Sequence, residues 1–468
     1  MHIWRQADCL SFAYQYFSYD NSIFEPKVLN LGPTGNGKTG SDFPIIFYLI
    51  GLIWKIVGVH ESIFKGLTFC ISLLGFTSMY GISKHFIKNN FIAILIPLFI
   101  LTSPVYVYYS NSYLMNMYSL NLSLIAWYAF ISFIKTKKTN LLLLTVAIFV
   151  FASFLKITSL IHFIGFLAII IAQNFKGRIE KKQFFIVLVF SFLGFLMLLR
   201  WIIFIKTYNE LNISGMFLIG ILPIWKLNYE EFIKIGNEIF WRKNDLFSVP
   251  ALVISGISLL LLIWNLFKRK LEDVTIPLVI LISGFVAFFL LFYQVLDQHD
   301  YYFTNWLLIV PLSILYLIVH FPFPNIKYRR IGTLVLVVFL IDGLLNTEMR
   351  YQDKFQGWKN EFYVDLLADY EVSESELLKV GVSKSAKIIS ASDISINATL
   401  YSLKREGWTD YNLKRSQTLN SCKKLGATHL IVHSNFEIKD SEISSFMKQN
   451  TPKRLGKLSI YELIRQSD

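Results

Sequence analysis

Long apolar segments constrain the fold of this sequence more than any other feature. A helix needs roughly 18 or more apolar residues to cross a bilayer, and about ten segments approach or exceed that length. Hydrophobic residues make up 54% of the chain and charged residues only 16%. The sequence therefore predicts an all-α polytopic membrane protein. The segments lie near 63–83, 91–109, 113–134, 140–156, 158–174, 184–205, 247–267, 274–294, 304–321 and 330–347.

The segment 44–58 is shorter and begins at Pro44. We expect a re-entrant or interfacial helix there, and a full crossing is the alternative.

The gaps between the apolar segments alternate in charge. Every second gap is basic, whereas the short gaps between them hold no Lys or Arg except Lys156. Cytoplasmic loops collect Lys and Arg, so we expect the basic gaps to be cytoplasmic and residues 1–62, 206–246 and 348–468 to lie outside. The net charge of +13 then needs no nucleic-acid partner. The basic gaps contain Lys84 and Lys88; Lys135, Lys137 and Lys138; Lys176, Arg178, Lys181 and Lys182; Lys268, Arg269 and Lys270; and Lys327, Arg329 and Arg330.

This topology starts the chain outside the cytoplasm, although no signal peptide opens it. We expect a further transmembrane helix upstream of Met1, and translocation without one is the alternative. The three scattered cysteines have no metal-site or disulfide spacing.

Residues 348–468 differ in composition, because their apolar runs are too short to span a bilayer. Strands are predicted at 387–391, 428–433 and 457–464, with helices near 395–406, 416–425 and 439–449. We therefore expect a small α/β domain outside the membrane, acting as a lid or an acceptor-docking domain. The predicted organisation is an external loop (1–62), a helical bundle (63–347) and this domain (348–468).

The first 44 residues are polar and aromatic and carry Asp8, Asp20 and Asp42. A short amphipathic helix is predicted from His2 to about Phe17. An acidic loop next to apolar helices is where we expect the chemistry.

One nucleotide-binding pattern occurs in this loop. The segment Gly32-Pro33-Thr34-Gly35-Asn36-Gly37-Lys38-Thr39 matches G-x-x-x-x-G-K-[ST]. A phosphate-binding loop needs a buried strand before it and a helix N-terminus after it. Residues 28–31 are a poor strand, and a following helix would run through Pro44. We interpret the segment as a flexible Gly-rich loop and expect no ATP; a P-loop protein remains an alternative.

Several short motifs occur in order along the chain: Trp4-Arg5-Gln6-Ala7-Asp8, Ser41-Asp42-Phe43-Pro44, Ser103-Pro104 with Tyr108-Tyr109, Leu155-Lys156-Ile157-Thr158, and His299-Asp300-Tyr301-Tyr302 before Pro311. Together they resemble the GT-C superfamily of membrane glycosyltransferases. The nearest branch contains bacterial protein O-mannosyltransferase-like enzymes and the transferases that add aminoarabinose to lipid A. Two features depart from the family: its first transmembrane helix is missing, and Met115-Asn116 stands where many members carry an acidic residue.

The resemblance implies a multi-pass enzyme of the cell membrane with an external active site. It would transfer a sugar, with inversion, from a polyprenyl-phosphate donor to a protein, lipid A or glycan acceptor. An acidic residue of the first loop would be the base, which maps onto Asp8, with Asp42 as the second acid and Gln6 among the substrate-binding residues.

The chemistry requires a general base and cations for the leaving phosphate. Asp8 is the candidate base, and a solvated or capping aspartate is the alternative; Asp42 could instead cap a helix. Arg5 and Lys156 are candidates for the phosphate, although Lys156 could be a snorkelling lysine. Arg200 is a weaker candidate, because burying a charge costs less near the interface.

The segment His299-Asp300-Tyr301 is expected to position substrate, and an aromatic interface belt is the alternative. A divalent metal could bind His299, Asp300 and Asp297, but no spacing elsewhere supports one. A non-catalytic transporter or scaffold for lipid-linked sugars remains the alternative function.

Overall fold

The computed structural model describes residues 3–217, 220–268, 274–297, 299–321, 325–355, 361–415 and 417–463. These residues form two compact units. Unit 1 contains Met1–Ile63, Ile202–Ile219 and Lys354–Asp468, and unit 2 contains Phe64–Trp201 and Gly220–Asp353. Arg269, Lys270 and Ile464, which belong to the basic-gap and third-strand predictions, lie outside the described residues.

The described residues are mostly helical and end in a small mixed sheet, which confirms the predicted fold class. Within them, 8 helices are long and apolar enough to cross a membrane. The chain is therefore a multi-pass membrane protein. These spans are Glu61–Phe86, Met115–Thr136, Ile157–Phe175, Lys181–Leu211, Val249–Phe267, Thr275–Val295, Asp300–His320 and Ile326–Lys354.

Three apolar helices are shorter than a span: Ile45–Val57, Asn90–Thr102 and Thr139–Leu155. The first, α2, covers the segment for which an interfacial helix is predicted. The second ends at Thr102 because Ser103 has an extended backbone conformation. The Ser103 hydroxyl then caps a new helix, α5 (Pro104–Tyr109), by accepting a hydrogen bond from the Tyr106 N–H. The predicted crossing at 91–109 is therefore divided, whereas α7 (Thr139–Leu155) has the length predicted for 140–156.

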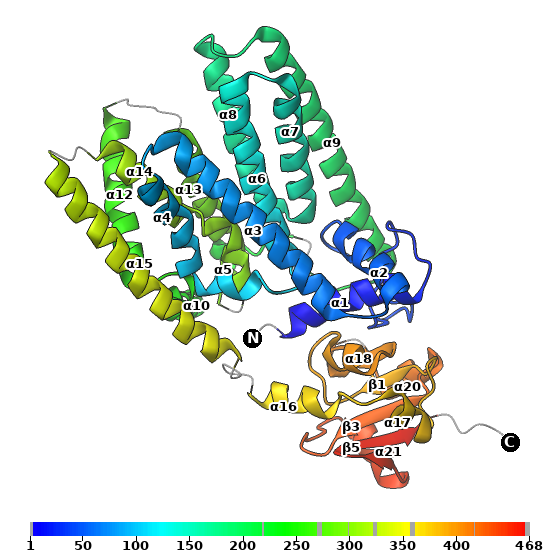
Figure 1. The fold of residues 1–468 in the computed structure, drawn as a ribbon. Helices are drawn as coiled ribbons and strands as arrows, with labels where there is room; N and C mark the ends of the chain where they lie inside the picture. The colour runs from blue at the N-terminus through cyan, green and yellow to red at the C-terminus, as the bar shows by residue number, and fades with distance from the viewer. Residues whose placement is uncertain are drawn as a thin grey trace. The chain divides into compact units, whose positions relative to one another are not determined.

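Unit 2 is built around aromatic packing between neighbouring helices. In Figure 1, α6 (Met115–Thr136), α7 (Thr139–Leu155) and α8 (Leu160–Phe175) run alongside one another. Phe149 of α7 lies 5.9 Å from Phe163 and 5.4 Å from Phe166, measured between ring centroids. Phe130 of α6 lies 5.1 Å from Phe166 in the same way, so this aromatic layer joins the three helices.

The other helices of unit 2 are α3 (Glu61–Phe86), α4 (Asn90–Leu98), α10 (Tyr229–Trp241), α11 (Lys243–Leu246), α12 (Val249–Phe267), α13 (Thr275–Phe292), α14 (Ile309–His320) and α15 (Ile326–Phe355). The helix α9 (Lys181–Leu211) continues from unit 2 into unit 1.

The sheet of unit 1 has the strand order β2-β1-β3-β5-β4. The strand β1 pairs in parallel with β2 and with β3, and β5 pairs antiparallel with β3 and with β4. The predicted strands correspond to β1 (Ile388–Ser390), β3 (His429–His433) and β5 (Leu458–Glu462). The strands β2 (Gly407–Thr409) and β4 (Lys453–Leu455) were not predicted, because three residues show no clear alternation.

Short helices surround this sheet. The predicted helical stretches contain α18, α20 and α21, and α16, α17 and α19 are additional. Their bounds are α16 (Glu361–Asp369), α17 (Glu374–Lys379), α18 (Ala398–Leu403), α19 (Asp410–Leu413), α20 (Leu419–Lys424) and α21 (Ser441–Gln449).

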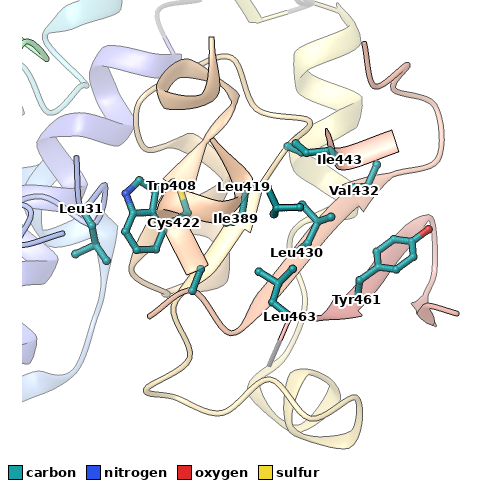
Figure 2. Close-up of a cluster of buried hydrophobic side chains, with 12 residues drawn as sticks. Leu31, Ile389, Trp408, Leu419, Cys422, Leu430, Val432, Ile443, Tyr461 and Leu463 are labelled. Carbon is teal, nitrogen blue, oxygen red and sulfur yellow. The ribbon is translucent and has the colours of Figure 1, made fainter. Parts of the chain in front are cut away.

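The N-terminal segment extends the sheet of the C-terminal residues. Asn30 forms a parallel bridge with Gly407 at the edge strand β2, and the Leu31 N–H donates to the Gly407 carbonyl at 2.7 Å. The Leu31 side chain belongs to the hydrophobic core of the C-terminal residues, and Figure 2 shows it beside Trp408. The Trp408 indole N–H donates to the Gly32 carbonyl at 2.9 Å. The first loop and the C-terminal domain therefore share one core.

The Gly-rich loop after Leu31 folds back on the chain. The Gly37 N–H donates to the Leu31 carbonyl, and the Thr39 N–H donates to the Pro26 carbonyl. Gly37 has a φ of +67°, and a Cβ there would lie 2.5 Å from the Val28 carbonyl oxygen, so only glycine fits. No helix of the described residues begins between this loop and Ile45. The strand–loop–helix arrangement of a phosphate-binding loop is therefore not formed here.

The first helix, α1 (Ile3–Ser18), agrees with the predicted amphipathic helix. It packs against α2 (Ile45–Val57), and a Cβ at Gly51 would lie 2.6 Å from the Tyr16 Cβ. The Phe12 and Phe47 rings stack at 5.2 Å. This close crossing holds α1 in place, with Asp8 among its buried residues.

Candidate functional site

Asp8 is a buried carboxylate in the second turn of α1. It is 5% exposed, and it lies on the buried side of the helix with Ala7 and Ser11. The Asn397 side-chain amide donates to Asp8 Oδ1 at 2.8 Å. Arg5, one turn earlier on α1, places its guanidinium 3.9 Å from Asp8 Oδ2. Each oxygen of the carboxylate therefore faces a donor or a cation.

Arg5 lies between two acidic residues. Its guanidinium is 3.9 Å from Asp8 and 3.6 Å from Asp42, and it lies over the Phe217 ring at 5.0 Å from the centroid. The structure therefore brings together three residues that the sequence analysis selected: Arg5, Asp8 and Asp42. One cation between two carboxylates leaves this group with a net negative charge when both acids are ionised.

Burial shifts the acidity of Asp8. Desolvation raises its pKa from 3.8 to about 6, although the Arg5 charge and the Asn397 hydrogen bond partly oppose the shift. A carboxylate that titrates close to neutral pH is a better general base than an ordinary aspartate, because it holds a transferred proton more strongly.

Gln6 is two residues before Asp8 on α1, and Asp42 is connected to Asp8 through Arg5. Pro44, and not Asp42, occupies the N-cap position of α2, and that helix has no side-chain cap. Asp42 pairs with Arg5 instead. Gln6 is half-buried on α1.

Asp20 is the acidic residue that the sequence analysis did not select. Its carboxylate pairs with Lys55 at 2.6 Å, and the Asp20 side chain is fully exposed. An exposed pair of this kind contributes little to stability.

A second group of predicted site residues lies in unit 2. Asp300 is buried and accepts a hydrogen bond from the Tyr109 hydroxyl at 2.6 Å. The Tyr301 carbonyl accepts from the Asn116 amide at 3.0 Å, at the position where the family departs from this sequence. These two bonds tie the segment after His299 to α5 and α6.

Lys156 and His299 belong to the same aromatic region of unit 2. Lys156 follows α7 and holds its ammonium 5.8 Å from the centroid of the Tyr302 ring. The His299 ring lies 5.2 Å from that of Tyr301 and 5.6 Å from that of Tyr302. Unit 2 therefore brings Lys156 and the predicted positioning residues together around Tyr302.

Arg200 is exposed on α9. Arg200 takes part in none of the contacts given above for the other candidate residues.

Among the described residues, no group of three or more His, Cys, Asp or Glu side chains could hold a metal ion. In the predicted metal-binding segment, one oxygen of Asp300 already accepts the Tyr109 hydroxyl.

The C-terminal contribution to the Asp8 environment was not predicted from the sequence. Asn397 is 389 residues from Asp8 in sequence, and Asn30 is linked to both Asn397 and Asn412. Asn397 precedes α18, Asn412 lies within α19 and Asn30 lies in the first loop. No motif or periodic pattern of the sequence connects these three asparagines.

Solved structures resemble this chain over most of its length. The structure of ArnT from Cupriavidus metallidurans bound to undecaprenyl phosphate matches with a TM-score of 0.62 and 9% identity, and the match covers 98% of this chain and 94% of that one. The chain has the fold of the GT-C membrane glycosyltransferases. No protein-family model and no curated protein sequence matches it.

The GT-C fold is also shared with an archaeal enzyme. The Archaeoglobus fulgidus oligosaccharyltransferase in complex with Zn and sulfate matches with a TM-score of 0.55 and 11% identity, over 92% of this chain and 63% of that one. The same enzyme tethered to an acceptor peptide containing the NVT sequon matches with a TM-score of 0.51 and 10% identity, over 92% of this chain and 65% of that one. The confirmed resemblance is thus one of fold.

Proposed function

We propose that this protein is an inverting membrane glycosyltransferase that takes a sugar from a polyprenyl-phosphate donor, with Asp8 as general base. The observation that carries this proposal is a buried carboxylate with a pKa of about 6, held by Asn397 and Arg5 in a chain with the GT-C fold. The donor class is supported by the ArnT structure, which is bound to undecaprenyl phosphate.

In the proposed reaction, Asp8 accepts the proton of an acceptor hydroxyl as the hydroxyl oxygen attacks the anomeric carbon of the donor sugar. The bond between that carbon and the phosphate oxygen breaks, and polyprenyl phosphate leaves with the electron pair. Attack opposite the leaving group inverts the anomeric configuration. Asp8 in its ionised form is therefore required at the start of each turnover.

Cations would stabilise the departing phosphate, and Arg5, Lys156 and Arg200 are the residues proposed for that role. The Arg5 distances of 3.6 Å and 3.9 Å to Asp42 and Asp8 exceed the usual hydrogen-bond length of about 2.9 Å. A phosphate bound at Arg5 would lie next to the proposed base and to Asp42. We assign His299, Asp300 and Tyr301 to substrate positioning, and Gln6 and Asp42 to the surroundings of Asp8.

The polyprenyl chain of the donor needs an apolar site. Unit 2 has an apolar pocket bounded by α3, α6, α8, α13 and α14. We propose this pocket for the prenyl chain, because the ArnT structure is bound to a molecule with such a chain. The residues that line it include Met79, Leu124, Phe130, Ile169, Leu281 and Leu312.

The acceptor is a protein, lipid A or another glycan, and we propose that the C-terminal α/β domain docks it on the outer face of the cell membrane.

The test is sugar transfer by membranes containing the protein, with a panel of polyprenyl-phosphate sugars as donors. Asp8→Asn keeps the shape of the side chain and removes the base, so we expect transfer to fall by about 10²–10⁴-fold. Asp20→Asn is the matched control, because Asp20 is an exposed carboxylate of the same loop. Equal activity of Asp8→Asn and wild type would mean that another residue is the base. Absence of transfer from every donor would favour a transporter or scaffold function.

A further inference from the structure

We propose that Asn397, in the C-terminal α/β domain, is a positioning residue that orients the Asp8 carboxylate for proton transfer. The inference rests on the proposed function, and it gives the C-terminal domain a direct part in the chemistry of the first loop. Asn397 touches Asp8 and not the reacting atoms, so it acts through the base.

The hydrogen bonds of Asn397 determine which end of its amide faces Asp8. Its Oδ1 accepts from the Asn30 backbone N–H at 2.9 Å and from the Ser11 hydroxyl at 3.2 Å. A backbone N–H can only donate, so the atom that faces it must be the oxygen. The Asn397 NH₂ group is therefore directed at Asp8, 2.8 Å away.

Asn30 is a buried anchor that prevents this amide from rotating. Asn30 is completely buried, and its NH₂ group donates to the Ile396 carbonyl at 2.8 Å and to the Asn412 side chain at 2.7 Å. Its Oδ1 accepts from the Asn412 amide at 3.0 Å. Rotation of Asn397 would leave the Asn30 N–H facing an NH₂ group in a site without water contact, which is costly.

The loop between β1 and α18 carries Asn397 and is itself fixed by the α/β domain. Asp393 in this loop accepts from the backbone N–H groups of Ser395 and Thr399, both at 2.8 Å, and from the Thr399 hydroxyl at 2.6 Å. Asp393 follows the carboxyl end of β1, the region where open parallel sheets usually bind ligands. In this chain that end of the sheet carries the residue that faces the proposed base.

The groups that face Asp8 come from three elements. Arg5 is on the same helix, Asp393 and Asn397 are on the β1–α18 loop, and Tyr411 is on α19, while Asp42 acts through Arg5. Burial and the Asp393 charge raise the pKa of Asp8, whereas Arg5 and Asn397 lower it. A hydrogen bond from Asn397 favours the ionised form, so its loss should raise the pKa further.

The test is the pH profile of kcat/KM for Asn397→Ala beside wild type. Because ionised Asp8 is the active form, the acidic limb of the profile should lie near the Asp8 pKa. Loss of a hydrogen bond to a charged group should move that limb upward by about one pH unit. Activity would then fall about fivefold at pH 6, approach a tenfold loss near pH 5 and recover toward the wild-type value at pH 8.5.

Gln417→Ala is the control for a merely structural effect. Gln417 is another buried side-chain amide of the α/β domain, and it accepts from the Ser421 hydroxyl. Its removal should lower thermal stability and leave the acidic limb in place. A limb that does not move in Asn397→Ala, with an equal loss of rate at every pH, would overturn the proposal.

Asn397→Asp is the second variant, for the case in which Asn397→Ala does not fold. It keeps the side-chain shape and the acceptor oxygens but replaces the donor facing Asp8 with a like charge, so the limb should move further upward. An unmoved limb in this variant also overturns the proposal.

The thermal midpoint in detergent separates this inference from the proposed function. The stability difference between wild type and Asn397→Ala should widen between pH 5 and pH 8, because Asp8 ionises in that window. If no donor supports transfer but the difference widens, the contact is established and the enzyme function fails. A difference that is constant with pH contradicts the inference even where transfer is observed.

Discussion

A buried polar network in unit 1 and an exposed apolar helix face in unit 2 serve different surroundings. Unit 1 buries polar residues completely, and Asn30, Asp393 and Asn397 are each 0% exposed and hydrogen-bonded. Unit 2 exposes apolar ones: Phe190 and Phe192 on α9 are 52% and 63% exposed. A lipid-facing helix needs apolar residues outside, whereas a buried polar site needs every donor matched to an acceptor. A residue type therefore predicts little about its role until its surroundings are known.

The largest effect should come from Asp8→Asn, in which activity and stability change in opposite directions. The Asp8 pKa is about 6 in the folded protein and near 3.8 without burial. Because the folded-state pKa is raised, the folded protein binds this proton more strongly than the unfolded chain does. The stability that the protonated carboxyl contributes is therefore full below about pH 4 and is lost as pH rises through 6. Two pKa units correspond to about 3 kcal/mol.

Asp8→Asn should therefore raise the thermal midpoint at pH 8 and leave it unchanged near pH 4, while transfer falls by about 10²–10⁴-fold. Differential scanning fluorimetry in detergent at both pH values measures the first effect. A lower midpoint for Asp8→Asn at pH 8 would mean that the Arg5 contact outweighs the cost of burying the carboxylate.

The next effect tests how much unit 1 depends on its polar network. Asn30→Ala removes a buried side chain that bonds to Ile396 and Asn412, so the Ile396 carbonyl and the Asn412 NH₂ group lose their hydrogen bonds to Asn30. We expect a loss of about 2–4 kcal/mol, measured as a lower midpoint and faster proteolysis of the first loop.

Asn36→Ala is the comparison for this variant. Asn36 is an exposed asparagine of the same loop, and its amide bonds to Asn212. Its replacement should cost less than about 1 kcal/mol. Similar losses for both variants would show that the buried network contributes no more than an exposed contact.

A third prediction tests the aromatic layer of unit 2. Phe149 is fully buried between Phe163 and Phe166, and Phe149→Ala should cost about 3–5 kcal/mol through lost packing. Phe192→Ala on the exposed face of α9 should have little effect on the thermal midpoint. Equal midpoints for the two variants would contradict the assignment of buried and exposed faces.

A fourth prediction concerns Lys404 in unit 1. Its ammonium lies 3.0 Å from the Tyr401 ring centroid, and burial lowers its pKa from 10.5 to about 7. Because the unfolded chain binds this proton more strongly, stability rises with pH between about 7 and 10. Lys404→Met should raise the midpoint by a few degrees at pH 6.5 and by less at pH 9.5. A midpoint gain of Lys404→Met that is larger at pH 9.5 than at pH 6.5 would contradict the expected lowering of the Lys404 pKa by burial.

Most of unit 2 could be predicted from the sequence, because a bilayer demands a minimum length of apolar residues. The exceptions depend on local detail. The predicted segment near 91–109 is divided where Ser103 caps a new helix at Pro104, and a hydropathy average does not detect a cap. In the C-terminal residues, β2 was missed because it is three residues long and is stabilised by pairing with β1 and the Asn30 segment.

The candidate site divides in the same way. Asp8 and Arg5 could be selected from a five-residue motif, and their spacing on a helix places them on neighbouring turns. The pairing of Arg5 with Asp42 and the hydrogen bond from Asn397 could not be selected, because they join segments distant in sequence. Hydrogen bonds of this kind leave no periodic pattern.

The sequence by itself determined the fold class, the short amphipathic helix and the position of Asp8, because apolar length, helical periodicity and local motifs are properties of neighbouring residues. The tertiary structure alone decided what surrounds Asp8. The strength of a base depends on its solvation and on the donors around it, and both are supplied here by residues from opposite ends of the chain.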